Sequence, residues 1–151
     1  MNDLAPGLAR CRALRDLNGD EIIALARLVE GREVAAGDPL FREGDEADEI
    51  LVIAEGAVRL ERGREALGVL GSGELLGGVC LAAVGQRACD AIAEEDVHVL
   101  ALSRSAYLQL RVDHPLIALA LHEGLLRELA GSVRALIDAQ AMLSGPRAPA
   151  A

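Results

Sequence analysis

The chain has 151 residues, enough for one domain with a hydrophobic core, and its formal net charge is −9. Nucleic-acid-binding surfaces are usually basic and stack bases on aromatic side chains, whereas this acidic chain has one Tyr, one Phe and no Trp. All 15 basic residues are arginines. This excludes Schiff-base and Walker-type chemistry, because both need a lysine.

Targeting signals are not apparent in the sequence. No apolar run reaches the roughly 18 residues that a membrane span needs, and the N-terminus lacks the basic and apolar regions of a signal peptide. The three cysteines, Cys11, Cys80 and Cys89, are odd in number and have no CxxC spacing. They indicate free thiols in a reducing compartment rather than disulfides or a zinc site. We therefore expect a cytoplasmic protein that does not enter a membrane.

The first part of the chain, residues 3–30, is predicted to be helical. Asn18 is placed to cap a helix whose apolar residues follow a period of about 3.6, and Gly31 is predicted to end it. From 32 to 102 the pattern changes to short apolar runs separated by turn-forming residues. Turn signals about every eight to twelve residues predict a compact sandwich or barrel. The clearest strands are 50–53, 57–60, 66–70 and 97–102, and 75–84 is a small-residue stretch with room for one or two helical turns.

Two helices are predicted over 103–143. Ser103 starts the first, and His114-Pro115 ends it and begins a second that runs to about Leu143, because proline suits the first helical turn. We expect 144–151 to form a flexible tail. No second domain is visible, so a single domain over 1–143 is predicted.

The last predicted helix carries an apolar seam whose spacing alternates between three and four residues, a repeat typical of coiled coils. A second stripe, Leu121, Leu125 and Ile137, is predicted to pack back on the strands. Because one small domain cannot cover both stripes, we expect a homodimer; the alternative is a monomer whose helix lies wholly on its own core. The predicted dimer contacts are Leu119, His122, Leu126, Leu129, Val133 and Leu136.

With its glycine-separated strands and terminal helices, the sequence resembles the cyclic-nucleotide-binding domain. That domain is shared by catabolite-activator-type transcription factors, regulatory subunits of cAMP-dependent protein kinase and nucleotide-gated channels. The resemblance covers about residues 15–137. Its most specific motifs are Gly44-Asp45-x-x-Asp48-x-Ile50-x-x-Ile53-x-x-Gly56-x-Val58, and Gly73-Glu74-Leu75-Leu76-Gly77-Gly78 followed by Arg87-Ala88.

The resemblance implies a mainly β fold with flanking helices. Its centre is an eight-stranded double-stranded β-helix (β-roll) over 32–102, with a helix before it and two helices after it, the last one long. It also implies hairpins in which glycine supplies a positive φ or a close backbone approach. The glycines at these positions are Gly44, Gly56, Gly73 and Gly77.

The resemblance further implies a ligand site. In the family, a short helix N-terminus and one arginine surround the cyclic phosphate, and Arg87 matches that arginine. A guanidinium fork makes charge-assisted hydrogen bonds to phosphate, and a helix N-terminus adds N–H donors. Ser132 matches a hydroxyl that the last helix offers to the base. The predicted ligand-binding residues are Leu76, Gly77, Gly78, Arg87, Ala88 and Ser132.

One position departs from the family pattern. Gly78 stands where the family has the glutamate that accepts the ribose 2′-hydroxyl. Losing a charged acceptor usually costs about 1.5–3 kcal/mol, or roughly ten- to a hundredfold in affinity, which weakens a site without necessarily erasing it. Glu74 lies four residues earlier and could substitute only if the loop rearranged.

Arg87 has a structural alternative to ligand binding. It could form a salt bridge with a neighbouring carboxylate, and Asp90 would compete with a ligand for it only if strand alternation failed.

The cysteines and histidines allow other interpretations. Cys80 and Cys89 could form a redox switch, although small cysteines in apolar surroundings usually only pack. No metal site is predicted, because His98, His114 and His122 lack ligand spacing and the acidic loop 43–49 lacks the offsets of a calcium loop.

These observations predict a stand-alone, non-catalytic sensor or regulatory domain that signals through its C-terminal helix to an unknown protein partner. A small anionic ligand is expected, with cAMP and cGMP as candidates and no other cofactor. The alternative is a dimerisation or protein-interaction module whose pocket no longer binds cyclic nucleotide. The family's transcription factors continue into a helix-turn-helix, and because this chain ends at Ala151 we expect no DNA binding by it alone. An enzyme on this roll would need a metal cluster of His and carboxylates, and the predicted strands hold only His98.

Overall fold

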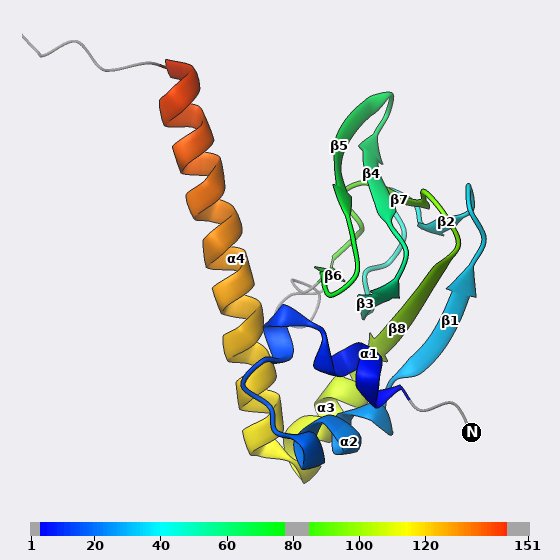
Figure 1. The fold of residues 1–151 in the computed structure, drawn as a ribbon, viewed down its shortest axis with the longest axis vertical. Coiled ribbons are helices and arrows are strands. Elements are labelled where there is room, and N and C mark those ends of the chain that lie inside the picture. Colours follow the sequence, from blue (N-terminus) through cyan, green and yellow to red (C-terminus); the bar gives the residue numbers. More distant parts are fainter. Residues whose placement is uncertain (1–3, 78–84, 145–151) are drawn as a thin grey trace, which may run out of the picture.

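The computed structural model describes residues 4–77 and 85–144. Within these residues the chain forms two antiparallel sheets of four strands each, with orders β1-β8-β3-β6 and β2-β7-β4-β5. Figure 1 shows the sheets on one side, the short helices gathered at one end of them, and the long helix α4 rising alongside. The predicted eight-stranded β-roll is confirmed. Its strands are β1 (Glu30–Val34), β2 (Pro39–Phe41), β3 (Glu49–Glu55), β4 (Val58–Arg62), β5 (Glu65–Leu70), β6 (Leu75–Leu76), β7 (Asp90–Ala93) and β8 (Val97–Ser103).

Three short helical segments precede the roll: α1 (Ala5–Ala9), the 3-10 helix η1 (Arg12–Leu14) and α2 (Gly19–Ala26). The predicted cap of α2 is confirmed as a capping box: the Glu21 amide donates to Asn18 Oδ1 (2.9 Å) and the Asn18 amide donates to Glu21 Oε1 (3.0 Å). The prediction that Gly31 ends this helix is wrong. Helix α2 ends at Ala26, and Gly31 lies in β1 opposite Leu100 of β8. The backbone from Glu30 onward pairs with β8, so it cannot continue a helix.

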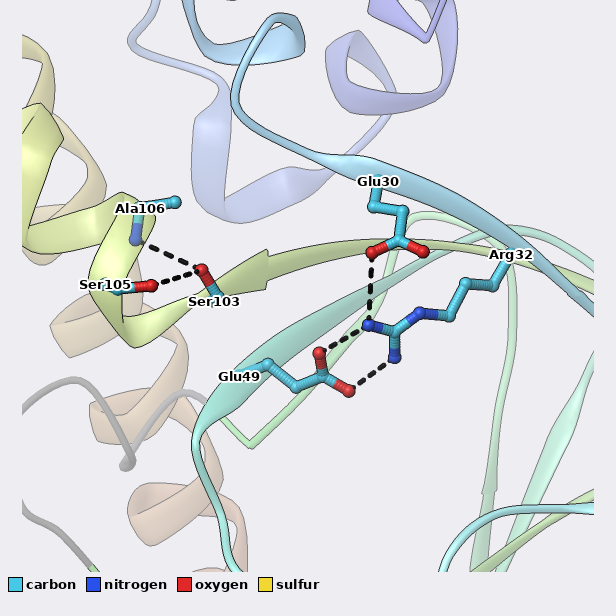
Figure 2. Close-up of polar contacts among 6 residues, drawn as sticks. All are labelled: Glu30, Arg32, Glu49, Ser103, Ser105 and Ala106. Atoms are coloured by element: carbon cyan, nitrogen blue, oxygen red, sulfur yellow. Dashed lines mark hydrogen bonds and ion pairs between the residues drawn. The ribbon is translucent and has the colours of Figure 1, made fainter.

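Two helices follow the roll, α3 (Arg104–Asp113) and α4 (Pro115–Ser144). Ser103, the last residue of β8, caps α3 by accepting a hydrogen bond of 3.1 Å from the Ala106 amide, as Figure 2 shows. The predicted break at His114-Pro115 is confirmed, since α4 begins at Pro115. Within the described residues no helix is both long enough and apolar enough to cross a membrane.

Strand β3 explains how the core is arranged. Its alternate residues Ile50, Val52 and Ala54 belong to an apolar cluster shared with the helices, whereas Leu51 and Ile53 belong to a second cluster inside the roll. Because both of its faces are covered, β3 is a nearly continuous run of apolar residues rather than an alternating one. Burying each such Leu or Ile contributes about 1.5–3 kcal/mol to folding.

The hairpin glycines adopt the predicted backbone. Gly44, Gly56, Gly73 and Gly77 have φ values of 90°, 96°, 88° and 79°. At Gly56 a close approach adds to this requirement, because a Cβ would lie 2.6 Å from the carbonyl oxygen of Asp96. These positions therefore require glycine for a physical reason.

The second apolar stripe of α4 is only partly confirmed. Leu121 is buried and Leu125 is half-buried, but Ile137 is 63% exposed and does not pack on the strands. All residues from 131 to 143 are exposed, because this part of α4 extends beyond the elements that cover its beginning.

Candidate ligand-binding site

Arg87 is the one charged residue in the buried core of the described structure, with 6% of its surface exposed. Its Nη2 donates to the carbonyl oxygen of Glu49 (2.8 Å), and its Cζ lies 4.3 Å from the centre of the Phe41 ring. The backbone around it is held as well, since the Arg87 amide donates to the Asp45 carbonyl (2.7 Å). The guanidinium is therefore fixed by neutral partners.

No ion pair within residues 4–77 and 85–144 includes Arg87, and its Nε is buried without a hydrogen-bond partner. The carboxylate of Glu49 is instead held by Arg32 through hydrogen bonds of 2.5 and 2.8 Å, drawn in Figure 2. Asp90 accepts from the Glu43 amide (2.7 Å) and lies 3.5 Å from Arg42. Arg87 is thus a buried cation with a free donor, an arrangement that is costly unless an anion completes it.

Gly77 lies directly against this guanidinium. A Cβ built on Gly77 would overlap Nη1 of Arg87, so only glycine leaves the arginine its place. Gly78 and Cys80 lie outside the described residues. Leu76 is buried within the roll, in β6 opposite Leu51 of β3. Ala88 is exposed, and its carbonyl oxygen accepts from Nε of Arg62 (3.1 Å).

A cavity of about 280 Å³ adjoins Gly77 between the roll and α4. This volume is close to the lower end of the range for small-molecule pockets, about 300 Å³. The structure brings Gly77 and Ser132 together in this cavity. Arg87, Leu76 and Ala88 are not among its lining residues, and Arg87 lies next to Gly77. The cavity is lined by Leu70, Glu74, Leu75 and Gly77 from the roll and by His122, Leu125, Leu126, Glu128, Leu129 and Ser132 from α4.

Glu74 is already engaged within the protein. Its carboxylate accepts from the Gly71 amide (2.6 Å) and from Arg12 (2.9 Å). It could therefore serve as an acceptor for a ligand only by giving up these hydrogen bonds.

Three contacts position α4 beside the cavity. The Tyr107 hydroxyl lies 2.6 Å from Nδ1 and 2.9 Å from Nε2 of His122, with the two rings edge to face. Burial raises the pKa of the Tyr107 hydroxyl, which therefore remains protonated at neutral pH. Gly124 lies so close to Ala13 that a Cβ would overlap the Ala13 carbonyl oxygen. The third contact is a 2.8 Å ion pair between Arg127 and Asp16.

The pairing of Tyr107 with His122 and the ion pair between Arg127 and Asp16 were not predicted from the sequence, because His122 was assigned to the dimer seam and Tyr107 had no assigned role. For Gly124 the sequence allows either a weakened helix or a close approach of another segment. The one available signal was a glycine inside a strongly helical segment, since such a residue often marks a close approach of two backbones.

The predicted dimer seam runs along the free side of α4. Leu119, Leu126, Leu129, Val133 and Leu136 are between 48% and 71% exposed, whereas His122 is half-buried against Tyr107. Leu126 and Leu129 also line the cavity. The seam and the cavity therefore share these two residues.

The structure describes two of the three cysteines, Cys11 and Cys89. Burial raises the pKa of the thiols of both Cys11 and Cys89, which disfavours the reactive thiolate. No group of three or more His, Cys, Asp or Glu side chains in this part of the chain could hold a metal ion.

Comparison with known proteins assigns the class. The sequence pattern of the cyclic nucleotide-binding domain matches residues 31–114. The chain belongs to the cyclic nucleotide-binding domain family. The cyclic AMP receptor protein of Thermus thermophilus is 42% identical over 87 residues, which are 54% of this chain and 40% of that relative. The chain thus corresponds to less than half of that protein.

Solved structures agree with this class. The N-terminal domain of a transcriptional regulator from Streptomyces coelicolor has a TM-score of 0.75 at 31% identity, covering 86% of this chain and 94% of its own. The catabolite activator protein of Thermus thermophilus has a TM-score of 0.71 at 32% identity, covering 85% and 63%. A cyclic nucleotide-binding domain from Methylobacillus flagellatus has a TM-score of 0.83 at 18% identity, covering 99% and 90%, and this likeness concerns the fold alone.

Proposed function

We propose that this chain is a non-catalytic sensor domain that binds a cyclic nucleotide, cAMP or cGMP, and passes the occupancy of the site to a protein partner through α4. The observation that carries the proposal is Arg87, a buried guanidinium with an unsatisfied Nε and no carboxylate partner in the described part of the chain. A cyclic phosphate would supply the missing charge and acceptors.

The cavity beside Gly77 also supports the proposal, because it could hold the base of a nucleotide whose phosphate binds Arg87. Its walls combine apolar side chains from β5, β6 and α4 with the hydroxyl of Ser132, which suits a flat base. A ligand anchored at Arg87 would touch the roll and α4 at once. Such a ligand shifts the position of α4 only if it binds one position better than another, and the contacts with Leu126, Leu129 and Ser132 can provide that difference.

Isothermal titration with cAMP and cGMP tests the proposal when Arg87→Met is compared with the unchanged chain. Methionine keeps an unbranched side chain over Phe41 and removes the charge. We expect affinity to fall by at least about tenfold, since hydrogen bonds to charged groups contribute about 1.5–3 kcal/mol. The matched control is Arg64→Met, because Arg64 is exposed and its substitution removes the same charge.

Thermal unfolding without ligand separates this role from a structural one. We expect Arg87→Met to change the midpoint little, because the lost hydrogen bond to Glu49 is offset by removing a buried, unpaired charge. A large fall in the midpoint would show that Arg87 serves the fold. Absence of heat with either nucleotide at high micromolar concentration would contradict the proposed binding.

A second candidate function, dimerisation without nucleotide binding, is favoured by the exposed seam of α4. Five of its six predicted contact residues are exposed apolar side chains, a pattern typical of helix pairing. We expect the double substitution Leu129→Glu and Leu136→Glu to convert a dimer to a monomer in light scattering. The control Ala135→Glu adds one charge to an exposed residue outside the seam and should leave the mass unchanged. A monomeric wild-type chain would contradict this second function.

A further inference from the structure

Strand β1 has one free edge. In the described residues it is the outermost strand of its sheet and pairs with β8 alone, and Figure 1 shows it on the side of the molecule opposite α4. In an antiparallel pair only alternate residues direct their N–H and C=O groups to the neighbouring strand. The remaining groups of β1 point away from β8, and an extended peptide can add to a sheet by pairing with such groups.

A groove lies on each face of this edge strand, because side chains alternate between the two faces of a sheet. The inner groove opens into the roll, has a volume of about 440 Å³ and is lined mainly by apolar side chains. The outer groove lies on the opposite face, has a volume of about 430 Å³ and is lined mainly by polar ones. Both grooves include Glu33 and Val34, so they meet at β1.

The inner groove suits apolar side chains. Its walls include Val34, Leu40, Leu51 and Val99, which belong to or pack against the apolar cluster inside the roll. Arg32 also lines this groove, but its guanidinium is already held by the carboxylates of Glu49 and Glu30, as Figure 2 shows. An apolar side chain entering here would therefore cover apolar surface without breaking an ion pair.

The outer groove suits basic side chains. It contains the carboxylates of Glu33, Glu55 and Asp96. Within residues 4–77 and 85–144, Glu33 and Glu55 form no side-chain hydrogen bond or ion pair, whereas Asp96 accepts from the Ala36 amide (2.9 Å). Glu33 and Glu55 also flank His98 in the strand register, one from β1 and the other from β3. Two free carboxylates on one sheet face would attract lysine or arginine.

The same charges disfavour a second copy of this chain as the occupant. A copy that added its own β1 would bring another Glu33 to the outer groove, and like charges on neighbouring strands are destabilising. The net charge of −9 opposes the approach of two copies as well. The edge therefore favours a partner of opposite charge.

We propose that β1 is a docking edge for a partner protein, which adds an extended segment of alternating apolar and basic residues as a further strand. The apolar side chains enter the inner groove and the basic side chains enter the outer one. The two grooves share no lining residue with the cavity beside Gly77, so the inference goes beyond the proposed function and does not depend on nucleotide binding.

Binding of synthetic peptides to the full chain, measured by fluorescence anisotropy, tests the proposal. The probe is a heptapeptide with blocked ends in which four arginines alternate with three valines. A first control has the same composition with its valines in one block, which removes the alternation. A second control replaces the arginines with glutamates, which reverses the charge. We expect saturable binding of the probe alone, and affinity that falls with added salt.

Two variants locate the binding site. Glu33→Arg should weaken binding of the probe by about three- to tenfold, because it replaces an exposed attraction with a repulsion. Glu65→Arg makes the same change on an exposed residue of β5, the edge strand of the other sheet, and should leave affinity unchanged. Hydrogen exchange should show that the probe protects backbone amides of β1.

Several results would overturn the proposal. These are no binding of the probe, equal binding of the probe and the block peptide, equal losses in the two variants, or protection of β5 in place of β1. Protection of β1 that rises with the concentration of the chain alone would assign the edge to a second copy and would overturn it too.

Discussion

The two halves of α4 share one apolar repeat but differ in what surrounds them. In the first half Ile117, Ala118 and Leu121 are at most 7% exposed, packed with the N-terminal helices and α3. In the second half every residue from 131 to 143 is exposed, including Val133, Leu136 and Ile137. Periodicity thus indicates which residues are able to pack, whereas the position of the rest of the fold decides which of them do.

The change between the halves falls at the cavity beside Gly77. The three contacts that fix α4, made by His122, Gly124 and Arg127, all precede Glu128, and the last residue of α4 that lines the cavity is Ser132. A ligand would therefore touch the helix where its fixed part gives way to its free part. Under the proposed function, binding at this place would influence the direction of the free half only if the ligand preferred one position of α4.

Among substitutions that test this difference between the two halves, Gly124→Ala is expected to change the stability of the protein most. The new Cβ would overlap the Ala13 carbonyl oxygen, so α4 or η1 must move, and such overpacking costs about 1–3 kcal/mol. We expect a lower unfolding midpoint, by about 2–4 °C for each kcal/mol in a chain of this size, measured by thermal denaturation.

Gly131→Ala is the matched control in the free half. A Cβ at Gly131 meets nothing within 4 Å, so alanine should raise helix stability by about 0.5–1 kcal/mol. The two substitutions are chemically identical, and opposite signs are expected. Equal effects would show that the halves of α4 are held in the same way.

A smaller effect is expected from Tyr107→Phe. The ring of Tyr107 is fully buried and is retained, but its hydroxyl contact with His122 is lost. Removing one such hydrogen bond costs about 1 kcal/mol, which chemical denaturation can measure. We also expect faster hydrogen exchange in the first half of α4 and no change in the second half; a uniform change along the helix would contradict the role assigned to this contact.

The smallest effect is expected from Asp16→Asn, and it should depend on pH. The hydrogen bond and charge of Arg127 lower the pKa of the Asp16 carboxyl below its ordinary value of 3.8. The ion pair therefore contributes stability above that ordinary value and loses it as the pH falls through the lowered one. Asp16→Asn should reduce the unfolding midpoint slightly at pH 7 and lose its effect below the lowered pKa.

The control for this pair is Asp138→Asn, which removes a carboxylate from the exposed second half of α4. It should change the midpoint little at either pH. A pH-independent effect of Asp16→Asn would show that the side chain acts through something other than its charge.

Features with local causes were predicted well. The caps at Asn18 and Ser103, the start of α4 at Pro115 and the positive φ of the hairpin glycines follow from interactions within a few residues. The assignment of Gly31 as a helix end was wrong because its partner, Leu100, lies far along the chain. Ile137 was misassigned because periodicity does not reveal where the roll stops covering the helix.

The candidate site divides in the same way. A motif resemblance was enough to select Arg87, Gly77 and Ser132, although their roles in binding remain predictions. It did not reveal that Glu49 and Asp90 are engaged elsewhere, which leaves Arg87 without a carboxylate partner in the described residues. Nor did it reveal the pairing of Tyr107 with His122.

The sequence by itself determined the helix caps at Asn18 and Ser103, the hairpin glycines and the family, because turns, caps and apolar spacing depend on residues close together in the chain. Only the tertiary structure decided which charges are neutralised and which half of α4 is covered. Ion pairing and burial depend on which distant segments meet, and local sequence preferences do not contain that information.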